Sequence, residues 1–206
     1  AYQRKGNLEK AEEILLEASR AHPRDSALVC NLGTLYLQRG EAGKAGEYFR
    51  RALALDPKNA AAHTNLGVAY FNLEQWDDSI RELEKAVKLA PGSIQPYLNL
   101  AIVYNLKGEL EKAEAYLKRG LEYAPRSHAA HLMLGRVSLE LKKDGAARDH
   151  FSRAYQLRPK DPETNYFLGL LLQREADAYF QRARGAPGQR LRMESATGKS
   201  PDRRAP

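Results

Sequence analysis

Several features are scarce in this chain of 206 residues, and each scarcity excludes a class of protein. Cysteine occurs once, at Cys30, so the sequence supports neither a disulfide framework nor a cysteine-based structural zinc site. No apolar run approaches the roughly 18 residues that a membrane-spanning helix requires. No apolar signal segment is visible in the first residues. The composition, with 43% hydrophobic and 29% charged residues, is nevertheless typical of a folded globular protein.

The excess of positive charge is concentrated toward one end of the sequence. The net charge is +7, from 33 Lys and Arg against 26 Asp and Glu. Residues 182–206 hold seven basic and two acidic residues, a net of +5, which leaves a net of only +2 for residues 1–181. We therefore expect no long basic face on the folded part and no nucleic-acid partner.

What the sequence has in abundance is repetition with a period of 34 residues. The pair Leu-Gly or Leu-Ala begins at Leu32, Leu66, Leu100, Leu134 and Leu168, and a proline recurs at Pro23, Pro57, Pro91, Pro125 and Pro159. Small and large residues spaced by four and three, such as Ala45, Phe49 and Ala52, fall on one face of a helix. Candidate helix N-caps stand at Asp25, Asn59, Ser93, Ser127 and Asp161. Each unit therefore predicts a helix–turn–helix hairpin.

These residues resemble the tetratricopeptide repeat family. Its pattern of Leu-Gly-x-x-Tyr, Ala-x-x-x-Phe-x-x-Ala and a terminal proline covers nearly everything from residue 1 to about 161. The resemblance implies an all-α fold, a right-handed superhelical solenoid of 34-residue helix–turn–helix repeats. We expect an array over residues 1–184, with a partial repeat 1–25, complete repeats 26–59, 60–93, 94–127 and 128–161, and a degenerate repeat or capping helix 162–184.

The first residues fit only the second half of a repeat. The register places Ala1 near the end of a first helix and Gly6 at the turn that follows it. We therefore expect the chain to be a fragment, with an isolated second helix that leaves Ile14 and Leu15 uncovered as the alternative. The opened first repeat predicts self-association.

Toward the other end, the second-helix pattern reappears out of register. Ala176, Phe180 and Ala183 arrive five residues too early, and no glycine turn precedes them. We predict one helix over about 163–184, with a shortened hairpin as the alternative. The Gly-, Pro- and Arg-rich residues 185–206 are predicted to form a disordered basic tail.

Three asparagines directly precede the repeated leucine. In the family, residues near this leucine line the concave surface, and the resemblance carries that role to Asn31, Asn65, Asn99, Thr34, Gln38, Thr64, Val68, Phe71, Asn72, Leu98, Ile102, Asn105 and Arg136. An asparagine amide both donates and accepts a hydrogen bond, so a row of them can hold the backbone of an extended peptide. The alternative is that these asparagines are part of the family pattern and make only intrahelical contacts.

Two other kinds of site are not expected. Some family members clamp a C-terminal carboxylate with cationic groove residues, but the matching positions here are Cys30, Thr34, Gln95 and Asn99. His128 and His131 lie one helical turn apart, but no third ligand occurs at helical spacing, so we expect no metal and no cofactor.

The sequence thus predicts a protein–protein interaction scaffold whose partner is a protein or peptide, and it contains no recognisable catalytic site. The alternative is a substrate-recruiting arm of a larger enzyme, for which a glycosyltransferase is the family precedent.

Overall fold

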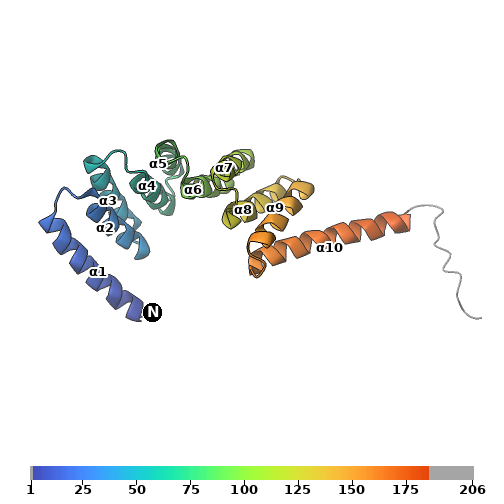
Figure 1. Cartoon of the computed structure of the whole chain (residues 1–206), viewed down its shortest axis with the longest axis horizontal. Coiled ribbons are helices and arrows are strands. Elements are labelled where there is room, and N and C mark those ends of the chain that lie inside the picture. The colour runs from blue at the N-terminus through green and yellow to red at the C-terminus, as the bar shows by residue number, and fades with distance from the viewer. Residues whose placement is uncertain (1, 186–206) are drawn as a thin grey trace, which may run out of the picture. The chain divides into compact units, whose positions relative to one another are not determined.

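The computed structural model of the chain describes residues 2–185, with side chains placed for 7–182. This part of the chain forms ten helices and no strand. They are α1 (Tyr2–Ala21), α2 (Ser26–Gln38), α3 (Ala42–Leu55), α4 (Ala60–Asn72), α5 (Trp76–Leu89), α6 (Ile94–Leu106), α7 (Leu110–Tyr123), α8 (His128–Glu140), α9 (Asp144–Leu157) and α10 (Pro162–Gly185) (Figure 1). The predicted all-α repeat fold is therefore confirmed.

The helices α2 to α9 form four consecutive hairpins. Packing is densest within the pairs α2–α3, α4–α5, α6–α7 and α8–α9, and the second helix of each pair also packs on the first helix of the next. The first helices contact one another as well, α2 with α4, α4 with α6, and α6 with α8 (Figure 1). Residues at one position of the repeat are thereby brought onto neighbouring helices.

Side-chain hydrogen bonds begin most of the first helices as predicted. The side chains of Asp25, Asn59, Ser127 and Asp161 each accept a hydrogen bond from a backbone N–H two or three residues later. These bonds satisfy donors that have no partner within the helix. Ser93 has the backbone conformation of a cap but makes no such side-chain bond.

The turn inside each hairpin uses one residue with a left-handed backbone. Gly40 and Gly108 have φ angles of 79° and 75°, and Glu74 and Lys142 adopt 59° and 57° in the other two hairpins. Glycine takes this conformation without the steric cost that a Cβ brings. The turn predicted at Gly6 is wrong, because this residue lies inside α1.

A large apolar residue in each second helix fills the centre of its hairpin. Phe49, Leu83, Leu117 and Phe151 are fully buried, with an exposed fraction of 0%. The small residues that flank them on the same helix face, such as Ala147 and Ala154 around Phe151, are equally buried. The alternation of small and large residues in the sequence therefore builds the core.

The segment after the fourth hairpin is a single helix. The sequence allowed one helix or a shortened hairpin, and α10 runs without a break from Pro162 to Gly185. By their internal contacts the described residues divide into two compact units, one ending at Leu168 and the other beginning at Gly169. Apart from Gly185, the predicted basic tail lies outside the described residues.

Candidate functional site

The first helices of the hairpins carry every predicted contact residue. Asn31, Thr34 and Gln38 lie on α2, Thr64, Asn65, Val68, Phe71 and Asn72 on α4, Leu98, Asn99, Ile102 and Asn105 on α6, and Arg136 on α8. Because these helices contact one another in sequence, the residues follow one another from hairpin to hairpin.

The predicted residues differ in how much surface they offer. Thr64 and Leu98 are each only 8% exposed, and the Thr64 hydroxyl donates to the Ala60 carbonyl at 2.8 Å. These two side chains therefore belong mainly to the packing between helices. Asn31 and Gln38, in contrast, are exposed on α2.

The amide of Asn65 is used inside the structure. Its Nδ2 donates to Thr34 Oγ1 at 3.4 Å, and that hydroxyl donates to the Cys30 carbonyl at 3.1 Å. Burial raises the pKa of the Cys30 thiol, an effect that the nearby Asn65 amide partly offsets. Cys30 is thus a protonated thiol with little nucleophilic character, and Asn65 links α4 to α2.

The amide of Asn99 is different because half of it has no partner. Its Oδ1 accepts a hydrogen bond from Gln95 Nε2 at 3.1 Å. Its Nδ2 is buried and makes no hydrogen bond to any described residue. One repeat earlier, Thr34 supplies the acceptor for Asn65, but the equivalent position here is Val68, which has none. A buried donor without an acceptor costs about 1–3 kcal/mol, so an acceptor on a ligand would be favourable here.

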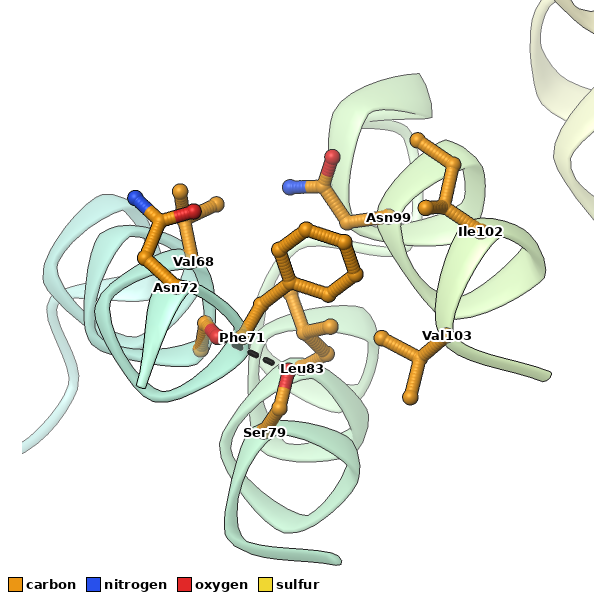
Figure 2. A pocket seen from close by; sticks show the side chains of 9 residues that line it. Val68, Phe71, Asn72, Ser79, Leu83, Asn99, Ile102 and Val103 are labelled. Carbon is orange, nitrogen blue, oxygen red and sulfur yellow. Dashed lines mark hydrogen bonds between the residues drawn. The ribbon is translucent and has the colours of Figure 1, made fainter. Parts of the chain in front are cut away.

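This amide stands over a small apolar cavity of about 160 Å³, which we call the α4–α6 cavity. Its lining residues are Gly67, Val68, Phe71, Asn72, Ser79, Leu83, Asn99, Ile102 and Val103. Figure 2 shows Val68 and Asn72 on one side of the Phe71 ring and Asn99 and Ile102 on the other. The Ser79 hydroxyl is already satisfied, because it donates to the Gly67 carbonyl at 2.8 Å. The cavity therefore offers apolar walls, two amides and no formal charge.

A second depression, the α6–α8 hollow, continues from Ile102 toward α8. It has a volume of about 390 Å³ and is lined by Ile102, Asn105, Leu106, Met133, Arg136, Val137 and Glu140. Arg136 forms an ion pair with Glu163 at 2.9 Å, and its guanidinium lies 5.6 Å from the centre of the Phe167 ring. Among the residues that line the α4–α6 cavity and the α6–α8 hollow, only Arg136 and Glu140 on α8 carry a formal charge. The lining residues on α4 and α6 are uncharged.

Sequence reasoning missed the residue that orients Asn99. Gln95 lies one helical turn before Asn99, a spacing at which two side chains on a helix meet, and this spacing was the available signal. Leu83 and Val103 also escaped notice as cavity residues, because their positions in the repeat are typical of core residues.

Two other kinds of site are absent from the described residues. No described helix is both long and apolar enough to cross a membrane. Within that same part of the chain, no three His, Cys, Asp or Glu side chains are grouped to hold a metal ion. His128 Nε2 bonds to Thr164 Oγ1 at 2.9 Å, whereas His131 Nδ1 lies 3.2 Å from His150 Nδ1. The two histidines that share a helix face thus have different partners.

Comparison with known proteins supports the repeat architecture. The family model for the tetratricopeptide repeat matches residues 1–60, 31–94 and 98–162. The crystal structure of MamA matches with a TM-score of 0.68 and 24% identity, over 77% of this chain and 92% of that one. YrrB, reported as a TPR protein with an unusual peptide-binding site, matches with a TM-score of 0.65 and 20% identity, over 81% of this chain and 86% of that one. A chain of the APC/C hetero-tetramer Cut9–Hcn1 matches with a TM-score of 0.70 and 21% identity, over 83% of this chain and 34% of that one. No curated protein matches the chain at a significant level.

Proposed function

The chain belongs to the tetratricopeptide repeat family, and we propose that it is an interaction scaffold that binds an extended segment of a partner protein across α4, α6 and α8. The observation that carries the proposal is the Asn99 Nδ2 group, a buried donor without an acceptor among the described residues, over an uncharged apolar cavity. A peptide carbonyl is the neutral acceptor that this donor fits.

The size of the α4–α6 cavity indicates which ligand side chain it takes. A protein cavity of about 150 Å³ can hold a benzene molecule, and this one has about 160 Å³. Its walls, formed by Val68, Phe71 and Ile102, would therefore receive one leucine, methionine or phenylalanine side chain, while Asn99 bonds the adjacent backbone carbonyl. The ligand is thus an uncharged, extended segment with an apolar anchor residue.

Further along the ligand, polar groups would contribute smaller contacts. Asn72 borders the α4–α6 cavity and Asn105 the α6–α8 hollow, so both amides lie along the path of the bound segment. Each neutral hydrogen bond contributes about 0.5–1.5 kcal/mol to the free energy of binding, and the entropy cost of ordering the peptide offsets part of this gain. We therefore expect micromolar affinity. The fold similarity to YrrB, whose peptide-binding site is reported, is consistent with this mode. The same surface would serve if the array were the recruiting arm of a larger enzyme.

The experiment that tests the proposal selects peptides from a random phage-displayed library on the full chain and measures their affinity by fluorescence anisotropy. Selected peptides should share an apolar anchor residue. Asn99→Ala should weaken their binding about three- to tenfold, which corresponds to one neutral hydrogen bond. Because this change removes an unpaired buried donor, it should not lower the melting temperature of the free protein.

The matched control is Asn65→Ala, at the same position one repeat earlier. Its amide is engaged by Thr34, so its loss should affect binding less than the loss of Asn99. A second variant, Ile102→Lys, places a charge at the boundary of the α4–α6 cavity and should abolish anchor binding. Selected peptides whose affinity changes with neither Asn99→Ala nor Ile102→Lys would show that they bind another surface.

A further inference from the structure

Three glycines in the first helices are each covered by a large side chain of the second helix. The pairs are Gly33 with Phe49, Gly67 with Leu83, and Gly135 with Phe151. A Cβ atom at Gly67 would lie only 2.6 Å from Leu83 Cγ, closer than packed atoms approach. Glycine is favoured at these three positions because the second helix packs closely on the backbone there.

Gly169 in α10 stands 34 residues after Gly135, and no described side chain covers it. A Cβ at this position would meet no atom of the described chain within 4 Å. Apart from proline, glycine is the residue least favourable to a helix, and Gly169 lies in the interior of α10. The described residues therefore give no packing reason for glycine here, while an external helix packed on the backbone would.

The surface around Gly169 is apolar and exposed. At 100° per residue, Gly169, Leu172, Ala176 and Phe180 fall on one side of α10, and we call this set the Gly169 face. Leu172 is 49% exposed and Phe180 61% exposed. By the same geometry Arg174, Glu175 and Arg182 fall on the opposite half of the helix, and Asp177 falls at the edge of the Gly169 face. A partner for this face is therefore apolar and not charged.

The four hairpins show which kind of element covers such a face. In α9 the residue that covers Gly135 is Phe151, and alanines four residues before it and three after it let the helix approach closely. Residues 186–206 contain only two large aliphatic residues, Leu191 and Met193, together with three prolines, so their sequence lacks this pattern. These residues therefore do not provide a covering helix of this kind.

We infer that the Gly169 face docks an amphipathic helix of a partner protein, whose phenylalanine or leucine packs on Gly169 between two small residues. This surface is separate from the α4–α6 cavity and needs no extended ligand. The partner helix would take the place that α9 takes on α8, and α10 would gain the second helix that the four hairpins already have.

The test uses the full chain and a labelled, helix-stabilised peptide with the sequence of α9, residues 144–157, as the probe. Anisotropy should show saturable binding, and replacing the phenylalanine at position 151 of the peptide by alanine should weaken it at least about tenfold. In the full chain, Gly169→Leu should weaken binding by a similar factor. The chain variant should fold, because a side chain at 169 has open space. Gly43→Leu adds the same side chain at another open helical position and should leave the affinity unchanged.

Each other outcome overturns the inference. Absence of saturable binding means that the face does not accept such a helix. Binding that Gly169→Leu does not alter means that the peptide replaces α9 in its own hairpin. Concentration-dependent dimers of the free chain that Gly169→Leu dissolves would identify a second copy, not a different protein, as the occupant. Peptides selected on the α4–α6 cavity should bind the Gly169→Leu variant normally, which separates failure here from failure of the proposed function.

Discussion

The hairpin α8–α9 and the helix α10 carry the same dipeptide at the same point of the repeat, but only one of the two glycines is packed. Gly135 in α8 lies against Phe151, whereas Gly169 in α10 lies against no described atom. Sixteen residues after Gly135 comes Phe151, and sixteen residues after Gly169 comes Gly185. A repeated residue therefore has the repeated role only where its partner is repeated too.

The largest effect on the free energy of unfolding is expected from adding one methyl group at Gly135 or at Gly169. Gly135→Ala forces a Cβ into the fully buried Phe151 ring and should lower the free energy of unfolding by about 1–3 kcal/mol. Gly169→Ala has open space and should raise it by about 0.5–1 kcal/mol, because alanine is the better helix former. Urea unfolding followed by circular dichroism measures both changes.

A double variant sharpens this comparison. The third hairpin has alanine and leucine at the two positions, Ala101 and Leu117, both fully buried in one cluster. Combining Gly135→Ala with Phe151→Leu copies that pair and should recover part of the stability lost in Gly135→Ala. Equal effects of alanine at positions 135 and 169 would contradict the idea that packing by the second helix distinguishes them.

The hairpin α8–α9 and the helix α10 also differ in whether the side chain at one repeat position can take up a proton, and the expected effect on stability is smaller. His131 Nε2 donates to the Pro125 carbonyl at 3.1 Å, and in α10 Asn165 Nδ2 donates to the Pro159 carbonyl at 3.0 Å. With Nε2 protonated, His131 Nδ1 must accept from His150 Nδ1, which lies 3.2 Å away in α9. Two neutral imidazoles are thus coupled in the hairpin, while α10 uses an amide that does not titrate.

Acidification should therefore destabilise α8–α9. Burial lowers the pKa of His131 below its ordinary value of 6.5, and burial together with the neighbouring His131 lowers that of His150. As the pH falls through 6.5, the unfolded chain takes up protons that the folded chain does not, so stability is lost toward acid pH. Lys118 and Arg153 act in the same direction, whereas Asp149 and Glu114 oppose it at His150.

The matched variant for this prediction is His131→Asn, which copies Asn165. It keeps a donor for the Pro125 carbonyl but removes the coupled pair. Melting temperatures measured from pH 7.5 to about 5 should fall more steeply for the natural chain than for the variant. Parallel curves would show that the loss of stability arises elsewhere.

The period of 34 residues was sufficient to predict the hairpins, most caps and the buried residues, because each depends on residues close in sequence. The difference between Asn65 and Asn99 was not predicted. It depends on one residue 31 positions earlier, Thr34 in the first case and Val68 in the second, and on the helix contact that brings them together. The Gly169 face was not predicted for the same reason, because the glycine alone does not show whether a second helix covers it.

The smallest expected effect concerns two serines one repeat apart. Ser127 Oγ accepts from the Ala130 N–H at 3.3 Å at the start of α8, whereas Ser93 makes no side-chain bond at the start of α6. Ser127→Ala should cost about 0.5–1 kcal/mol of stability, and Ser93→Ala should cost nothing measurable. Amide hydrogen exchange in the first turn of each helix would resolve the difference, with faster exchange expected only at Ala130. A loss of protection in both helices, or in neither, would mean that the backbone conformation of the cap and not its side-chain bond holds the helix start.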